Sequence, residues 1–205
     1  MANAPKFSGS SLWLVPPEGS ELYKAIEQLI KTTIPSLYPI AIPPLFAPHI
    51  TLTADTLSAG VEEKAPQKRL DDLNLSGLDN FKVTIGEVTV GSIFFQKLTM
   101  QCEKTQALCN LAAYCRGVGL QDEQEAREWV EKEYRPHASL MYSDLPEEEI
   151  QSKLDDIKAK IREAKQGASD AKGGAIWLVP TFKDVSDWQP VARREFPDME
   201  WSWET

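Results

Sequence analysis

Two short patterns each occur twice in this chain of 205 residues, once in each half, and they constrain its fold. Residues 12–16 (LWLVP) return almost unchanged as residues 176–180 (IWLVP). The second pattern is Pro-His followed by apolar residues, with a hydroxyl two positions after the histidine, at residues 48–53 and 136–142. Short apolar runs of this kind are typical of buried strands. Each half therefore contains a tryptophan strand and a histidine strand, which predicts two pseudo-symmetric lobes around a central groove.

The rest of the sequence predicts elements that complete an α+β fold. Apolar periodicity predicts helices over residues 21–33, 58–73 (interrupted or begun near Pro66), 105–116 and 146–165, and alternation predicts an antiparallel strand pair over residues 81–90 and 93–101. Ser20 is the expected N-cap of the first helix, and residues 166–174 are an expected loop. We therefore expect an antiparallel sheet with flanking helices in each lobe, within one domain over residues 1–205.

Charge and composition narrow the classes of function. The formal net charge is −9 and the pI is near 4.8, which disfavours long nucleic acid, because its binding requires many Lys and Arg contacts to phosphates. A small phosphorylated ligand is compatible with such a surface. No apolar run approaches the ~20 residues of a membrane span and no secretory signal is present, so we expect an intracellular, cytoplasmic protein. Cys102, Cys109 and Cys115 lack metal-binding spacing and are expected to be free thiols, with a disulfide between two of them as the alternative.

The histidine patterns give the strongest indication of function. On a strand, residues two apart face the same side, so His49 shares a face with Thr51, and His137 with Ser139. An imidazole transfers protons near neutral pH, and a neighbouring hydroxyl can donate to a phosphate oxygen. One such histidine is more often a core residue, but both histidines of the chain occur in the same pattern. Two such strands brought together predict an acid, a base and two phosphate donors in one site.

These motifs resemble those of the 2H phosphoesterase superfamily. The stretches SLWLVPP, APHITLT, GSIFFQ and RPHASLMYS occur in the order seen in eukaryotic cyclic phosphodiesterases of the plant and fungal type. The resemblance implies two α+β lobes that enclose a water-filled groove. It also implies hydrolysis of nucleoside 2′,3′-cyclic phosphates to 2′-phosphates, and of ADP-ribose 1″,2″-cyclic phosphate to ADP-ribose 1″-phosphate, with a place in RNA metabolism and tRNA splicing.

The resemblance further implies which residues perform the reaction. It makes His49 and His137 the acid/base pair, with His49 as base and His137 as acid by analogy, although the sequence itself does not assign the two roles. It makes Thr51 and Ser139 the residues that hold the phosphate. No metal or other cofactor is expected, and the implied partner is a small cyclic nucleotide bound by a monomeric enzyme.

Further residues near the motifs have a functional and a structural interpretation. Tyr142 matches a tyrosine of the second motif, and Trp13 and Phe95 match aromatic positions that flank the pocket in similar enzymes. Core packing explains these aromatic residues equally well. The basic residues Lys97 and Arg135 are candidates for holding a terminal phosphate, but solvated surface charges are the more common case.

Three alternatives stay open at this point. A metal-dependent hydrolase would use the two histidines with acids such as Asp55 or Asp144, although the spacing and the hydroxyls make a poor ligand set. A non-catalytic nucleotide-binding module would keep the fold for recognition alone. Other 2H activities, on 2′,5′-linked RNA or oligonucleotides, form the third alternative.

Overall fold

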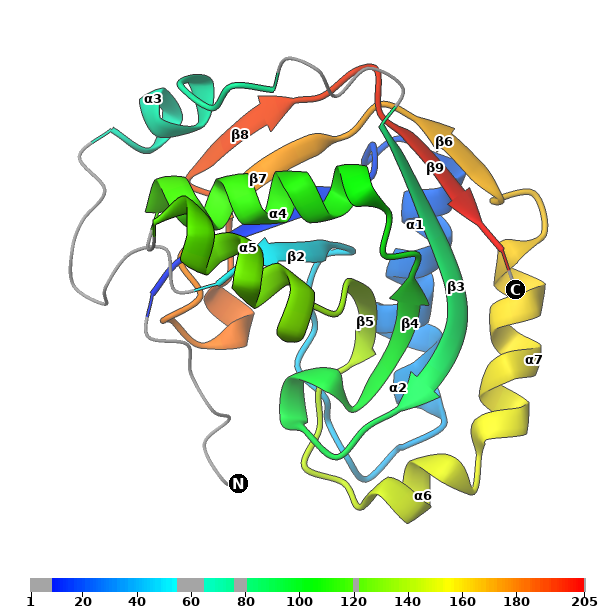
Figure 1. The fold of residues 1–205 in the computed structure, drawn as a ribbon. Coiled ribbons are helices and arrows are strands. Elements are labelled where there is room, and N and C mark those ends of the chain that lie inside the picture. Colours follow the sequence, from blue (N-terminus) through cyan, green and yellow to red (C-terminus); the bar gives the residue numbers. More distant parts are fainter. Residues whose placement is uncertain (1–8, 55–64, 76–80, 120–121, 205) are drawn as a thin grey trace.

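The computed structural model describes residues 9–54, 65–75, 81–119 and 122–204 (Figure 1). Its strands are β1 (Ser11–Val15), β2 (Ile50–Thr53), β3 (Lys82–Val90), β4 (Leu98–Cys102), β5 (His137–Met141), β6 (Asp170–Lys172), β7 (Ala175–Val179), β8 (Ala192–Glu195) and β9 (Glu200–Trp203). The helices are α1 (Glu21–Gln28), the π-helical η1 (Leu29–Thr33), α2 (Ile34–Ser36), α3 (Pro66–Asp71), α4 (Gln106–Gly119), α5 (Glu123–Lys132), α6 (Glu147–Gln151), α7 (Leu154–Lys165) and two 3₁₀ turns, η2 (Phe94–Gln96) and η3 (Val185–Asp187).

The described strands join in one curled sheet, in the order β6-β9-β3-β4-β5-β2-β1-β7-β8 (Figure 1). Its two halves, β6-β9-β3-β4-β5 and β2-β1-β7-β8, meet where β2 pairs with β5 through one register pair, Ile50 with Ala138. Each half thus places a histidine strand at this seam. The predicted α+β class with two lobes is confirmed, and the lobes are joined as halves of one sheet.

The prediction that each lobe has its own tryptophan strand is wrong. β1 pairs antiparallel with β7 along its whole length, with Trp13 opposite Trp177, so both strands lie in the same half. Every residue of β1 and of β7 is buried, and this shared environment accounts for their similar apolar sequences. A second difference concerns β9, which runs parallel to β3 where an antiparallel sheet was expected.

The first predicted helix begins where expected but changes form before it ends. Ser20 Oγ accepts a hydrogen bond from the Tyr23 backbone N–H at 3.1 Å, which confirms the N-cap. α1 buries Leu22 and Ile26, then continues through η1 into the short α2, which contains Pro35.

The other predicted segments are confirmed with local differences. The antiparallel pair is β3 with β4, although η2 occupies the start of the expected second strand. The helix predicted over residues 105–116 is α4, which begins at Gln106 and runs on to Gly119, and the helix predicted over residues 146–165 is divided into α6 and α7. Within residues 58–73 the structure places α3 from Pro66, while residues 58–64 lie outside the described part. The expected loop at 166–174 contains the short strand β6, and neither α5 nor β8 was predicted.

The helices α4 and α5 lie close to the seam between the two histidine strands. Figure 1 shows these two helices side by side in front of the sheet, with α1 behind it. α4 contacts both α5 and β2, and α7 contacts α1. Within the described ranges, no helix combines the length and apolar character required to cross a bilayer.

Candidate active site

The seam between β2 and β5 sets the two histidine motifs against one another. Because Ile50 lies opposite Ala138 in antiparallel register, one step to either side brings His49 opposite Ser139 and Thr51 opposite His137. Side chains alternate along each strand, and Ile50 and Ala138 are buried in the core. Each histidine is therefore aligned with the hydroxyl residue of the other motif, on the face opposite the core.

Both histidines are held by the same backbone interaction. The Nδ1 atom of His49 lies 2.7 Å from the carbonyl oxygen of Ala47, and Nδ1 of His137 lies 2.7 Å from that of Arg135. A carbonyl oxygen only accepts hydrogen bonds, so in each ring Nδ1 carries the proton and donates it. Nε2 is then the nitrogen that gains and loses a proton, which suits each histidine to act as a base when neutral and as an acid when protonated.

The two histidines differ in burial, and this separates their protonation. His49 is 6% exposed, and burial lowers its pKa to about 4, against a smaller opposing effect of the hydrogen bond to Ala47. His137 is half-buried, and burial also lowers its pKa, against the hydrogen bond to Arg135. The charge of His137 lowers the pKa of His49 a little further, which reflects the proximity of the two rings.

Aromatic rings enclose His49. The indole of Trp13 stacks on the imidazole with ring centroids 3.6 Å apart and planes inclined by 9°. Phe46 approaches the same imidazole edge-on at 5.9 Å. Trp13 itself is 2% exposed, so its contact is with His49 and the core more than with solvent. These rings cover the imidazole on the side of the core and fix its plane.

The hydroxyls of the two motifs have different partners. Ser139 Oγ donates to the carbonyl oxygen of Phe95 at 3.1 Å, whereas Thr51 Oγ1 makes no hydrogen bond to another described residue. The Tyr134 hydroxyl donates to the backbone carbonyl of Thr51 at 3.3 Å, and its burial holds the pKa of Tyr134 well above the usual value. The residue that precedes the second motif by two positions therefore contacts the backbone of the first.

All seven residues predicted from the sequence line one cavity of about 550 Å³. They are His49, Thr51, His137, Ser139, Tyr142, Trp13 and Phe95. This volume is in the usual range for sites that bind small molecules. The structure therefore brings together residues from β1, β2, η2 and β5, together with Tyr142 just after β5.

An aromatic wall forms one side of this cavity. Tyr142 packs edge-on to Phe95 at 5.2 Å and to Trp188 at 6.0 Å, and Trp188 stacks near Phe95 at 5.9 Å. Burial raises the pKa of Tyr142 above its usual range, against a hydrogen bond with Ser139 that lowers it, so the phenol stays protonated. Trp188 was not predicted, because it follows η3 in a segment with no motif.

The cavity also has lining residues on and after the helices α4 and α5, most of which the sequence did not indicate. Arg116, Trp129, Glu133, Tyr134 and Arg135 line it. Of these only Arg135 was a candidate, through its position beside the second histidine motif. The others lie on or beside α4 and α5, and helical periodicity alone does not show that their polar faces meet a strand end.

Apart from Arg135, the other candidate residues that the structure describes do not join the seven in the cavity. Lys97 is 4% exposed and does not line the cavity, so its interpretation as a solvated surface charge is wrong. Asp144 is exposed, and Asp55 lies outside the described residues. No group of three His, Cys, Asp or Glu side chains within the described ranges is arranged to hold a metal ion. Cys102, Cys109 and Cys115 are free thiols, as predicted.

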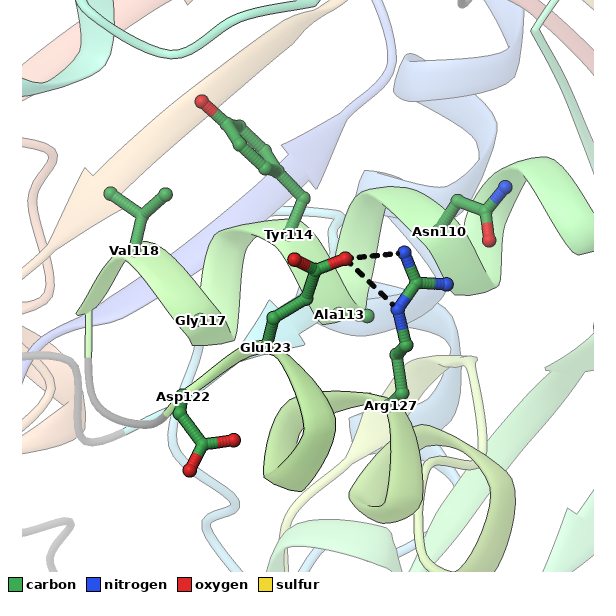
Figure 2. Close-up of a pocket in the computed structure, with 8 residues that line it drawn as sticks. All are labelled: Asn110, Ala113, Tyr114, Gly117, Val118, Asp122, Glu123 and Arg127. Atoms are coloured by element: carbon green, nitrogen blue, oxygen red, sulfur yellow. Dashed lines mark hydrogen bonds and ion pairs between the residues drawn. The ribbon is translucent and has the colours of Figure 1, made fainter.

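Figure 2 shows a second cavity, of about 350 Å³, between α4 and α5. On its rim Arg127 donates to the Glu123 carboxylate through Nη2 at 2.7 Å and Nε at 3.2 Å. Its described lining includes none of the residues predicted from the sequence. The histidine cavity is therefore the candidate active site.

Comparisons with known proteins agree on one family. The model of the family described as cyclic phosphodiesterase-like protein matches residues 8–196. A 2′,3′-cyclic-nucleotide 3′-phosphodiesterase of Phaeosphaeria nodorum is 34% identical over 194 residues, which cover 91% of this chain and 98% of that protein. A protein of the same name from Neurospora crassa is 30% identical over 209 residues, with 91% and 98% covered. Among solved structures, Escherichia coli LigT in complex with phosphate matches 98% of this chain and 100% of its own, at 12% identity and a TM-score of 0.42.

Proposed function

The chain belongs to the cyclic phosphodiesterase-like protein family, and on that premise we propose that it hydrolyses nucleoside 2′,3′-cyclic phosphates to nucleoside 2′-phosphates. The family assignment makes the protein a hydrolase of phosphodiester bonds. One observation supports the proposal most: two histidines, each with Nδ1 fixed by a backbone carbonyl, line the same cavity beside Thr51 and Ser139.

In the proposed mechanism His49 is the base. A water molecule attacks the cyclic phosphorus, and Nε2 of neutral His49 takes its proton. The burial that lowers the pKa of His49 to about 4 favours this neutral form at cellular pH. The stacked Trp13 holds the imidazole in one orientation, so the nitrogen is positioned before the substrate binds.

His137 is the proposed acid. As the bond between phosphorus and the ribose 3′ oxygen breaks, Nε2–H of protonated His137 gives its proton to that oxygen. His137 is more exposed than His49, and the negative charge of a bound cyclic phosphate favours its protonated form. The product is the 2′-phosphate with a free 3′ hydroxyl, and paired proton transfer of this kind contributes typically ~10²–10⁴-fold to the rate.

Thr51 and Ser139 are the proposed donors to the non-bridging phosphate oxygens. Negative charge accumulates on those oxygens as water attacks, and fixed hydroxyl donors stabilise it. Ser139 would turn its proton from the carbonyl of Phe95 to the phosphate when substrate binds. Tyr142 and Phe95 form the wall against which the ribose or base would pack.

We also propose ADP-ribose 1″,2″-cyclic phosphate as a substrate, with ADP-ribose 1″-phosphate as product. It contains the same five-membered cyclic phosphate on a ribose, and the cavity of about 550 Å³ exceeds the space needed for the cyclic phosphate alone. Such substrates arise in RNA metabolism and tRNA splicing, which is the setting we propose. The substrate is a single small molecule, and the residues proposed to act on it all come from one chain, so a monomeric enzyme is proposed.

Phosphorus NMR tests the proposed activity directly. Each nucleoside 2′,3′-cyclic phosphate and ADP-ribose 1″,2″-cyclic phosphate is incubated with the protein in excess chelator. We expect the 2′-phosphate and the 1″-phosphate as products. Formation of the 3′-phosphate would contradict the assigned bond cleavage, activity abolished by chelator would support a metal-dependent hydrolase, and no turnover would favour 2′,5′-linked substrates or a binding module.

A further inference from the structure

The lining of the histidine cavity carries more positive than negative side chains, although the protein is acidic. The described lining includes two arginines, Arg116 and Arg135, and one glutamate, Glu133, whereas the whole chain has a formal net charge of −9. Arg135 also donates to the carbonyl oxygens of Tyr134 and Lys132, which keeps its guanidinium against the backbone. A local positive charge inside an acidic surface favours an anionic group of the ligand in this cavity.

Arg116 is positioned by an aromatic ring. Its guanidinium lies over the indole of Trp129, 4.2 Å from the ring centroid. Because all donors of a guanidinium lie in its plane, stacking one face on Trp129 directs those donors sideways. One of them, Nη1, contacts Thr53 Oγ1 at 3.4 Å, a long hydrogen bond that a charged acceptor would readily replace.

The contact with Thr53 places the Arg116 guanidinium beside the strand that carries Thr51. Thr53 lies two residues beyond Thr51 on β2, so both side chains face the same side, about 7 Å apart along the strand. Thr51 is the residue proposed to hold the cyclic phosphate. A separation of this order is the one that the ribose imposes between a 5′-phosphate and a 2′,3′-cyclic phosphate on the same nucleoside.

We propose that Arg116, stacked on Trp129, forms a second anion subsite that binds the 5′-phosphate of a nucleoside 2′,3′-cyclic phosphate. The preferred substrate class is then a nucleotide phosphorylated at both ends of the ribose. This inference deepens the proposed function and rests on it, because it assumes that the cyclic phosphate lies between the two histidines.

Paired substrates test the subsite. The measurement is kcat/KM for adenosine 2′,3′-cyclic phosphate and for the same compound with a 5′-phosphate. In the wild type we expect the 5′-phosphorylated substrate to be favoured about tenfold, the worth of one charge-assisted hydrogen bond. Arg116→Met should reduce that ratio to about one, mainly through KM, and Arg116→Lys should keep part of it, because the charge remains while the planar fork is lost.

Arg127→Met is the matched control. Arg127 is a neighbouring arginine on α5, is paired with Glu123 and lines the other cavity (Figure 2). This variant should keep both the wild-type ratio and the wild-type activity. Equal kcat/KM for the two substrates in the wild type, or a preference that persists in Arg116→Met, would overturn the subsite while leaving the phosphodiesterase activity in place.

A binding measurement tests the Arg116 subsite even if no turnover is detected. Calorimetry compares adenosine 2′-phosphate with adenosine 2′,5′-bisphosphate, the corresponding products. Tighter binding of the bisphosphate, by about tenfold and lost in Arg116→Met, supports the subsite. Equal affinities in the wild type overturn it. Failure of the proposed hydrolysis is a separate result, visible as no conversion of either cyclic substrate.

Discussion

The indole of Trp13 covers one face of the His49 imidazole at 3.6 Å, nearly parallel to it. Trp13 lies on β1 and His49 immediately precedes β2, and these strands are paired, so the contact follows from the sheet itself. The contact dehydrates His49 on one side, and burial is the largest cause of its lowered pKa. Trp13 is therefore best described as a positioning residue for the proposed base.

Trp13→Leu should shift the pH dependence of the reaction. A base must be neutral, so kcat/KM rises with pH through the ionisation of His49, near pH 4 in the free wild-type enzyme. Removing the indole admits water, the pKa of His49 returns towards 6.5, and the rising limb of kcat/KM moves to higher pH. The pH profile of kcat/KM checks this.

Trp177→Leu is the control for that variant. Trp177 lies opposite Trp13 on β7 and is equally buried, but it does not line the cavity. Both variants should lose stability, by up to about 3–5 kcal/mol. Only Trp13→Leu should move the rising limb of the pH profile of kcat/KM. A shift of equal size in the two variants would show that the effect comes from the loss of stability and not from the contact with His49.

Thr51→Val and Ser139→Ala should each lower kcat/KM by about 10²-fold, the usual cost of losing one donor to a developing oxyanion. The pH profile should keep its shape, because neither change removes a histidine, and burial keeps the pKa of Tyr142, the partner of Ser139, above its usual range. Ser139→Ala also leaves the carbonyl of Phe95 without its hydroxyl donor, so a loss of about 1 kcal/mol in unfolding free energy is expected. Steady-state kinetics and denaturant unfolding measure the two effects.

Thr84→Val provides the comparison for the threonine variant. Thr84 is a buried strand threonine on β3, whose Oγ1 accepts a long hydrogen bond from Ser202 outside the cavity. Its kcat/KM should stay at the wild-type value. Wild-type kinetics in Thr51→Val would mean that this hydroxyl does not act on the phosphate.

Tyr134→Phe should separate positioning from simple stability. The Tyr134 hydroxyl donates to the backbone of Thr51, and its removal should reduce the unfolding free energy by about 0.5–1.5 kcal/mol. Because that bond ties the segment just before the second motif to the backbone of the first, we also expect a several-fold fall in kcat with little change in KM. Tyr114 is the control: its hydroxyl accepts a hydrogen bond from the Asn74 N–H and it does not line the histidine cavity, so Tyr114→Phe should change stability alone. If Tyr134→Phe keeps the wild-type kcat, the hydrogen bond contributes to stability and does not position Thr51 for the reaction.

The sequence predicted the residues of the site more accurately than it predicted the topology of the sheet, and the reason is physical. His49 with Thr51 and His137 with Ser139 are local pairs, and strand alternation alone puts each pair on one face. That β2 meets β5 at Ile50 and Ala138 depends on contacts between segments far apart in the chain. No local pattern encodes such a register, and the motif resemblance supplied the pairing instead.

The missed features share this non-local origin. The direct pairing of Trp13 with Trp177 could not be read from the similarity of their strands, since buried strands resemble one another wherever they lie. β9 pairs in parallel with β3 across more than a hundred residues, and its Trp201 and Trp203 are buried there. Arg116 reaches the cavity only because α4 packs on β2.

The most direct test of the histidine pair is the pH profile of kcat/KM for a nucleoside 2′,3′-cyclic phosphate in the wild type, His49→Ala and His137→Ala. The wild type should give a bell with its maximum below pH 6.5, because burial lowers the pKa of both histidines: the acid limb belongs to neutral His49 and the alkaline limb to protonated His137. Each variant should lose about 10²–10⁴-fold in rate, with the acid limb missing in His49→Ala and the alkaline limb missing in His137→Ala. Wild-type turnover in either variant, or a profile that neither substitution changes, would contradict paired histidine catalysis.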